Sequence, residues 1–149
     1  MAQEKKPQQV RDVMTANPKT VTEKDSVLEV ARIMRDKDTG VVPVVDGKKI
    51  IGMVTDRDIV VRCVADGKEI KNCTVSDVMT RKVRTVNEED SMRDVLTVMS
   101  SEQVRRVPVV NRNNEIVGIV SMKDLADESS DERKVGQAVE DISRGPANN

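Results

Sequence analysis

Two short motifs combine a hydroxyl side chain with a carboxylate three positions later. Thr55 precedes Asp58, and Ser121 precedes Asp124. Each pair follows an apolar stretch that begins with a glycine, and the spacing places both side chains at the start of a helix. A carboxylate there can accept both hydroxyls of a ribose, while the positive end of the helix attracts phosphate. Both motifs are therefore candidate nucleotide-binding sites.

The same spacing also has a purely structural interpretation. A Ser or Thr N-cap with an acid at the third helical position forms a capping box, which satisfies free backbone N–H groups. Thr74-Val75-Ser76-Asp77 and Ser91-Met92-Arg93-Asp94 share the spacing. The pattern alone therefore does not separate capping from binding, and both interpretations can hold for the same residues.

Basic side chains are distributed unequally around the two motifs. Arg57 and Lys123 lie within them, and Arg105 and Arg106 stand where the other copy of the pattern has Gly40-Val41. Guanidinium groups suit phosphate oxygens, so Arg105 and Arg106 are candidate phosphate ligands. A solvated strand edge or a salt bridge is the alternative explanation for this pair.

The chain contains an internal duplication. Val13-Met14-Thr15 returns as Val78-Met79-Thr80, and Val42-Pro43-Val44-Val45 returns as Val107-Pro108-Val109-Val110, so that Val13 to Val78 and Val42 to Val107 give the same offset of 65 positions. Two similar units that pack together generate a pseudo-twofold axis, and clefts beside such an axis are natural places for small ligands. The duplication therefore predicts two related clefts.

Length and charge narrow the class of protein. Each half of the 149-residue chain is small, and a unit of about 60 residues buries only ~60% of its unfolded surface, so we expect the halves to share a core. With 25 basic and 26 acidic side chains, the chain has no electrostatic footprint for nucleic acid or an anionic membrane. No apolar run is long enough to span a bilayer, and the N-terminus lacks an apolar signal region, so we expect a cytoplasmic location.

Missing residue types exclude several chemistries. The chain has no His, which removes the commonest general base and metal ligand, and no nucleophile is paired with a base, so we expect neither an enzyme nor a metal site. It has no Phe, Tyr or Trp, so a bound base would lie between aliphatic walls. Cys63 and Cys73 lack metal-site spacing; we expect reduced thiols, with a disulfide as the alternative.

Apolar periodicity and turn residues predict the order strand, helix, strand, strand, helix in each copy. In the first copy the expected elements are an extended Thr20-Val21, a helix after Asp25-Ser26 that closes at Asp36 to Gly40, a hairpin of Val41 to Val45 and Lys49 to Val54, and a Thr55-capped helix ending at Asp66-Gly67. In the second they are Thr85-Val86, a helix from Ser91 through Ser100, strands at Arg106 to Val110 and Glu115 to Val120, and a Ser121-capped helix. Short helical segments are expected at Arg11 to Met14 and Val75 to Met79.

The predicted organisation has four parts. A disordered lead-in covers residues 1–9, the two repeats cover 10–70 and 71–127, and a charged tail covers 128–149. Within the tail, apolar residues predict a short amphipathic helix through Val135, Ala138, Val139 and Ile142, and residues 144–149 should be loose.

The duplicated motifs, in this order, resemble a tandem pair of cystathionine β-synthase (CBS) domains, the Bateman module, in its small stand-alone form. The resemblance runs from about Val10 to Asp127 and rests on the duplicated Asp-Val-Met-Thr and Val-Pro-Val-Val sequences and on the two Gly-x-x-(Thr/Ser)-x-x-Asp motifs. It implies an α/β (α+β) fold in which each repeat is a three-stranded sheet with two helices, packed with pseudo-twofold symmetry. It also implies adenosine-containing ligands, namely AMP, ADP, ATP, NAD or S-adenosylmethionine, in clefts between the repeats, with no catalysis and no required cofactor.

The resemblance also implies roles for individual residues. Thr55 and Asp58 would hold the ribose in one cleft, and Ser121 and Asp124 in the other. Met53 and Ile119 would flank the adenine, and the facing walls would come from Thr20, Thr39 and Gly40 in one copy and from Thr85, Val104 and Arg105 in the other. Arg105 and Arg106 would contact phosphate. Because the first copy has no charge at Gly40-Val41, we expect the cleft with Ser121 and Asp124 to be the stronger nucleotide site, and the other to take a less charged ligand or none.

The leading functional hypothesis is a non-enzymatic sensor whose ligand changes the arrangement of repeats or of chains. The resemblance implies a homodimer formed through helices, and the apolar faces of the helices that begin at Val27 and Ser91 are the expected second interface. The alternative is a ligand-free scaffold that acts through dimerisation, with the four motif residues serving only as caps. The sequence names neither the ligand nor a protein target.

Overall fold

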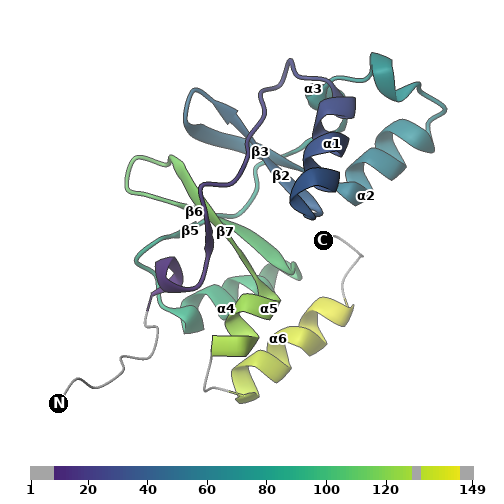
Figure 1. The fold of residues 1–149 in the computed structure, drawn as a ribbon. Helices are drawn as coiled ribbons and strands as arrows, with labels where there is room; N and C mark the ends of the chain where they lie inside the picture. Colours follow the sequence, from purple (N-terminus) through teal and green to yellow (C-terminus); the bar gives the residue numbers. More distant parts are fainter. Residues whose placement is uncertain (1–8, 129–131, 145–149) are drawn as a thin grey trace. The chain divides into compact units, whose positions relative to one another are not determined.

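The computed structural model describes residues 9–128 and 132–144 (Figure 1). Of the predicted lead-in at 1–9, residues 1–8 lie outside the described residues, whereas Gln9 forms a β-bridge with Ser91. The end of the predicted tail, residues 145–149, also lies outside them. The chain divides into two compact units. The first-copy unit comprises Pro18–Val83 and Asn113–Ile116, and the second-copy unit takes its residues from Met1–Asn17, Arg84–Arg112 and Val117–Asn148. Each unit is named after the copy of the Val-Pro-Val-Val hairpin that it contains.

The first-copy unit is a three-stranded sheet with helices. Its elements are α1 (Val27–Lys37), β2 (Val41–Asp46), β3 (Lys49–Thr55), α2 (Asp56–Ile59), the π-helix η2 (Val60–Val64), the 3₁₀ helix η3 (Ile70–Asn72), α3 (Val75–Val78) and β4 (Thr80–Arg81). The sheet order is β2-β3-β4, and Val21 adds a parallel bridge to Val44. The predicted helix after Thr55 therefore begins as an α-helix and continues as a π-helix, in which the Ala65 N–H donates to the Val60 carbonyl 2.8 Å away.

The second-copy unit has the same plan with one more named strand. Its elements are the 3₁₀ helix η1 (Val10–Asp12), β1 (Thr15–Ala16), β5 (Val86–Asn87), α4 (Met92–Glu102), β6 (Arg106–Val110), β7 (Ile116–Ser121), α5 (Met122–Glu128) and α6 (Glu132–Arg144). The sheet order is β1-β7-β6-β5, with β5 parallel to β6 and β1 antiparallel to β7. The mixed α/β fold class is confirmed.

The two Val-Met-Thr motifs pair with the hairpin of the other copy. On β1, Thr15 lies opposite Ile119 of β7, and on β4, Thr80 lies opposite Met53 of β3. Sequence patterning predicted the helical turns at these motifs but not the short strands that follow them. Two-residue strands carry no alternating pattern, so their backbone pairing depends on a partner that is distant in sequence. The predicted repeat limits, 10–70 and 71–127, remain a description of the sequence, because each compact unit takes a segment from the neighbouring repeat.

Two glycines make room for these short strands. A Cβ atom on Gly52 would lie 2.5 Å from the carbonyl oxygen of Thr80, and one on Gly118 would lie 3.0 Å from the carbonyl oxygen of Thr15. Each glycine is therefore required where a strand crosses closely over it. At both glycines the atom nearest to the added Cβ belongs to a methionine side chain, Met79 at Gly52 and Met14 at Gly118. The crossing backbone lies closer at Gly52 than at Gly118.

Buried apolar side chains form two clusters, and each of them is shared between the halves of the sequence, as chain length led us to expect. The first-copy cluster contains Val21, Val27, Val30, Ile33, Val42, Val44, Val54, Ile59, Cys63, Cys73, Val75, Val78 and Met79. The second-copy cluster contains Val10, Val86, Val95, Leu96, Met99, Val107, Val109, Val120, Leu125, Ala138 and Ile142. Each cluster includes residues from both sequence repeats, because the Val-Met-Thr segments are exchanged. A single repeat therefore does not supply a complete core.

Helices α1 and α4 occupy matching places in their units. The Ser26 Oγ accepts from the Glu29 N–H at 3.1 Å, and the Ser91 Oγ accepts from the Asp94 N–H at the same distance. Their apolar faces are buried within the single chain, through Val27, Val30 and Ile33 in α1 and Val95, Leu96 and Met99 in α4. These residues supply the cores of their own units, so an interface between two copies would have to use the partly exposed apolar residues of each helix, and that interface remains a prediction. No helix within the described residues combines the length and apolar character needed to cross a membrane.

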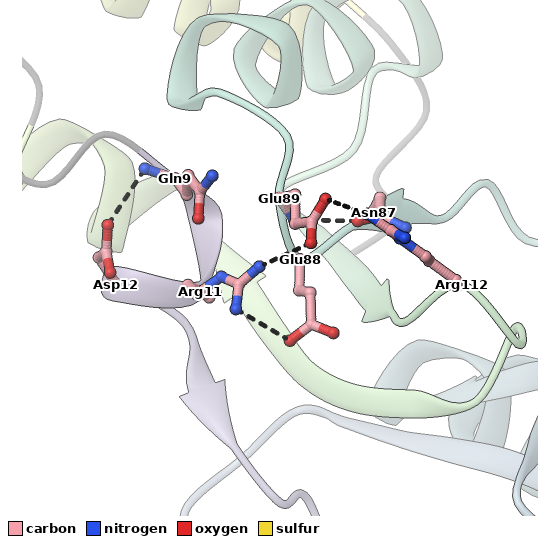
Figure 2. A network of polar contacts seen from close by, with 7 residues as sticks. All are labelled: Gln9, Arg11, Asp12, Asn87, Glu88, Glu89 and Arg112. Carbon is pink, nitrogen blue, oxygen red and sulfur yellow. Dashed lines mark hydrogen bonds and ion pairs between the residues drawn. The ribbon is translucent and has the colours of Figure 1, made fainter.

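A polar network fixes the N-terminal segment on the second-copy unit (Figure 2). The Arg11 guanidinium lies 3.2 Å from the Glu89 carboxylate and 4.0 Å from that of Glu88, and Arg112 lies 3.4 Å from Glu89. Backbone bonds reinforce these ion pairs, including one of 2.9 Å from the Val10 N–H to the Asp90 carbonyl. Val10 is fully buried, so this segment contributes to the core of the unit.

Helix α6 follows α5 and packs against both α4 and α5 (Figure 1). Ala138 is fully buried and Ile142 is 7% exposed, whereas Val139 is 48% exposed. The predicted helix forms in the described part of the tail and ends at Arg144, a residue that was expected to be loose. Residues 129–131 and 145–149 lie outside the described part.

Candidate functional site

Both hydroxyl–carboxylate motifs form complete capping boxes. The Thr55 N–H donates to the Asp58 carboxylate at 2.9 Å, and the Asp58 N–H donates to the Thr55 Oγ1 at 3.1 Å. The corresponding bonds between Ser121 and Asp124 measure 3.0 and 3.2 Å. The capping interpretation is therefore confirmed, and any ligand contact must use the oxygen lone pairs that remain.

The two carboxylates differ in how many of those lone pairs are used. The Thr80 Oγ1 donates to Asp58 at 3.3 Å from each carboxylate oxygen. At the matching place in the second-copy unit, Thr15 makes no hydrogen bond to Asp124 within the described residues. Asp124 therefore keeps more of its acceptor capacity, as a carboxylate that binds a ribose diol requires.

A backbone bond ties each capping box to the start of the preceding hairpin. The Asp56 N–H donates to the Gly40 carbonyl at 3.0 Å, and the Met122 N–H donates to the Arg105 carbonyl at 2.7 Å. The two bonds are structurally equivalent, so Arg105 stands where the first-copy unit has Gly40. The charge difference that the sequence indicated therefore lies directly beside the helix start in each unit.

Every predicted site residue falls in the unit that carries its motif. The first-copy unit contains Thr20, Thr39, Gly40, Met53, Thr55 and Asp58, and the second-copy unit contains Thr85, Val104, Arg105, Arg106, Ile119, Ser121 and Asp124. Their individual ligand roles remain predictions. Thr39 has a local structural partner, since its hydroxyl donates to the Val41 carbonyl at 3.1 Å.

The second-copy unit contains a pocket of about 400 Å³. Its lining residues are Arg105, Arg106, Ser121, Met122, Lys123, Val139 and Ile142. The structure therefore brings Arg105, Arg106 and Ser121 together as the sequence suggested. Thr85, Val104, Ile119 and Asp124 are not among the lining residues, although Asp124 is hydrogen-bonded to Ser121.

The pocket is electropositive. Among the described residues, its lining includes Arg105, Arg106 and Lys123 and no acidic residue. Within the described residues neither Arg105 nor Lys123 has an ion pair, and both side chains are exposed. Cations without a fixed counter-charge suit phosphate or another anion. The salt-bridge alternative for Arg105 is not observed in the described part of the chain.

Sequence reasoning missed several residues at these sites. Thr80, which bonds Asp58, was noted only as part of a repeated motif, and Val139 and Ile142 were placed in a tail outside the site. The duplication of the threonine in both Val-Met-Thr motifs was the available signal for Thr80. No sequence signal assigned the tail helix to the pocket, because that contact depends on tertiary packing.

The cysteines form a buried pair in the first-copy unit. The Sγ atoms of Cys63 and Cys73 lie 2.8 Å apart, and both residues are free thiols. The hydrogen bond with Cys63, together with burial, raises the pKa of Cys73 to about 11. In the described residues, no cluster of three or more Cys, Asp or Glu side chains is arranged to hold a metal ion.

A family model matches both halves of the chain. The CBS domain matches residues 10–64 and again residues 75–131. The matched regions include both hairpins and both capping boxes, and they end before α6 begins.

Relatives of similar length share this organisation. The uncharacterized protein YlbB of Bacillus subtilis is 40% identical over 138 residues, which cover 91% of this chain and 92% of YlbB. Hypoxic response protein 1 of Mycobacterium tuberculosis is 36% identical over 117 residues, covering 78% of this chain and 81% of that protein. The chain also matches an inosine-5'-monophosphate dehydrogenase of Korarchaeum cryptofilum at 33% identity, but covers only 22% of that enzyme.

Solved structures show the same fold. Hypoxic Response Protein I with two coordinated zinc ions superposes with a TM-score of 0.74 at 34% identity, covering 81% of this chain and 98% of that one. The CBS domain pair of MJ0100, in complex with 5-methylthioadenosine and S-adenosyl-L-methionine, gives a TM-score of 0.72 at 31% identity, with coverages of 81% and 95%. CBSX2 in complex with AMP gives a TM-score of 0.70 at 21% identity, covers 81% of this chain and 95% of that one, and supports the fold alone.

Proposed function

The chain belongs to the CBS domain family, and we propose that it is a cytoplasmic regulatory module that binds an adenosine-containing ligand. Domain pairs of this family are regulatory and not catalytic, so the chain is not an enzyme. The proposed ligands are AMP, ADP and ATP, with NAD and S-adenosylmethionine as further members of the class. A related domain pair, that of MJ0100, binds two adenosyl compounds, which supports this choice.

The observation that carries the proposal is the electropositive pocket beside the Ser121 capping box. Its unpaired Arg105 and Lys123 suit phosphate oxygens, and its apolar residues suit a ring that has no aromatic side chain to stack on. We place the phosphates at Arg105 and Arg106 and the ribose diol at Asp124, with Ser121 beside it. Thr85, Val104 and Ile119 are proposed to complete the surroundings of the adenosine.

In the first-copy unit we propose a weaker site, or one for a less charged ligand. Thr20, Thr39, Gly40, Met53 and Thr55 would line it. Gly40 supplies no charge, and Asp58 already accepts a bond from the Thr80 hydroxyl. A ligand diol would have to displace that bond, which lowers the net gain of binding.

Titration calorimetry of the whole chain with AMP, ATP and S-adenosylmethionine tests the proposal. We expect binding of at least one adenylate, with affinity that falls as salt concentration rises because phosphate contacts are screened. The matched variant Arg105→Gly copies the first-copy residue into the second site and should remove most of that binding. If none of the three compounds binds, the proposed function is wrong.

A second candidate function is a ligand-free scaffold that acts through a homodimer. Three large apolar side chains on η2 favour it, since Val60, Val61 and Val64 are 56%, 44% and 60% exposed. Exposed apolar residues on one helical segment are typical of an interaction surface. Light scattering on the wild type and on Val61→Glu tests this: a scaffold requires a dimer that the charge disrupts, with no adenylate bound by either form.

A further inference from the structure

Helix α6 lies outside the region that matches the CBS domain, yet it lines the pocket. The match ends at residue 131, whereas α6 covers Glu132–Arg144 and contributes Val139 and Ile142 to the lining. We propose that α6 is a wall of the ligand site and that binding of an anionic nucleotide is coupled to docking of this helix. The inference rests on the proposed function and adds to it a conformational output.

The attachment of α6 to the second-copy unit is specific. Ala138 and Ile142 enter the buried cluster, and the helix packs on α4 and α5. The Gln103 Nε2 donates to the Asp141 carbonyl at 3.1 Å. Gln103 is the C-cap of α4 and stands two positions before Arg105, so one polar bond joins α6 to the segment that presents the pocket arginines.

The walls of the pocket differ in chemistry. The segment before β6 and the start of α5 supply cations, whereas the described side chains that α6 contributes are the apolar Val139 and Ile142. A ligand with a phosphate group and an apolar ring can satisfy both walls together. Inorganic phosphate can satisfy only the cationic side, so the α6 wall favours an organic anion such as a nucleotide.

This arrangement couples ligand binding to the docking equilibrium of α6. A ligand that contacts both walls binds the docked form better than the undocked form, so it shifts the population toward the docked helix. Linkage makes the effect reciprocal, because a change that alters docking alters affinity by the same factor.

Opposite charges at Val139 test whether α6 faces the ligand. Val139 is 48% exposed, so Val139→Glu and Val139→Lys should both fold. The glutamate would compete with the nucleotide for Arg105 and Lys123, and we expect ATP affinity to fall by about tenfold, whereas the lysine should leave it unchanged or raise it by about twofold to fivefold. Val64→Glu and Val64→Lys are the matched controls, because Val64 is 60% exposed on η2 of the first-copy unit.

Hydrogen exchange tests the coupling itself. Amides of residues 136–143 should exchange more slowly when ATP is present, and inorganic phosphate at the same concentration should protect them less. Amides of α1 serve as the internal control, because α1 belongs to the first-copy unit.

The outcomes separate the two proposals. If the wild-type chain binds none of AMP, ATP and S-adenosylmethionine, the proposed function and this inference both fail. If it binds S-adenosylmethionine but neither ATP nor AMP, the proposed function stands and this inference is overturned. If the wild type binds ATP and Arg105→Gly removes binding, but the two Val139 variants behave alike and α6 shows no protection, the function stands and the inference is overturned. A sign-dependent effect at Val139 that is absent at Val64, together with protection of α6, supports it.

Discussion

The first-copy and second-copy units share a scaffold but differ at the residues that face a ligand. Both have a complete capping box and both hold the helix start to the preceding hairpin by a backbone bond. At that bond one unit has Gly40 and the other has Arg105, and only Asp58 carries an extra threonine bond within the described residues. Capping, which stabilises the fold, is thus kept in both copies, while binding chemistry is set by a few neighbouring side chains.

The largest expected difference between the units concerns their close-approach glycines. Gly52→Ala should destabilise the protein by about 3 kcal/mol, because its Cβ would meet the Thr80 carbonyl at 2.5 Å and overpacking costs ~1–3 kcal/mol or more. Gly118→Ala should cost about 1 kcal/mol, since the flexible Met14 side chain can move aside. Urea unfolding of both variants measures this, and equal costs would contradict the comparison.

The next effect concerns ligand affinity. Arg105→Gly should weaken ATP binding by about 10- to 100-fold, because a hydrogen bond to a charged group contributes roughly 1.5–3 kcal/mol. Its stability should change little, since the Arg105 side chain is exposed and has no ion pair in the described residues. Calorimetry and thermal unfolding measure the two properties, with Arg57→Gly, also exposed, as the control in the other unit. An unchanged ATP affinity would remove Arg105 from the site.

Alanine variants of the two capping aspartates should differ in opposite ways in unfolding stability and in nucleotide affinity. Asp58→Ala and Asp124→Ala each lose a capping box, which costs about 1 kcal/mol. Asp58→Ala should be the more destabilising of the two because it also loses the Thr80 bond. Asp124→Ala should cause the larger loss of nucleotide affinity. The opposite ranking in affinity would show that the open lone pairs of Asp124 are not used for ligand, and the opposite ranking in stability would show that the Thr80 bond adds nothing to the capping box of Asp58.

The smallest effect is a pH dependence confined to the first-copy unit. The pKa of Cys73 is raised to about 11 from an ordinary 9.0 by the hydrogen bond with Cys63 and by burial. The unfolded chain therefore loses this proton first, so the stabilisation is complete below about pH 9 and declines as pH rises toward 11. Urea midpoints at pH 8 and pH 10.5 should show a smaller decline for Cys73→Ala than for wild type, and an identical decline would contradict the assignment.

Local patterns predicted much of the fold. Helix α1 follows its Ser26 cap as expected, and α4 follows Ser91 but continues to Glu102, two residues beyond the expected end. Both hairpins form at the predicted Val-Pro-Val-Val strands. These features depend on residues close in sequence, so the sequence carries their signal directly. The proximity of Arg105, Arg106 and Ser121 was instead implied by the resemblance to CBS domain pairs.

Other features depended on long-range contacts. The exchange of β1 and β4 between copies, the division of the core into two clusters and the burial of the α1 and α4 faces each require partners far apart in the chain. The π-helical turn after α2 likewise follows no apolar period that a sequence pattern could reveal.

The sequence by itself determined the duplicated family pattern, the capping boxes and the asymmetry of charge, because residue type and spacing suffice for these. Tertiary structure alone decided that the Thr80 hydroxyl donates a hydrogen bond to the Asp58 carboxylate, and that α6 forms one wall of the pocket beside Ser121. Those contacts join segments separated by at least a helix or a strand. They form only where packing brings the segments together, and no local pattern encodes that placement.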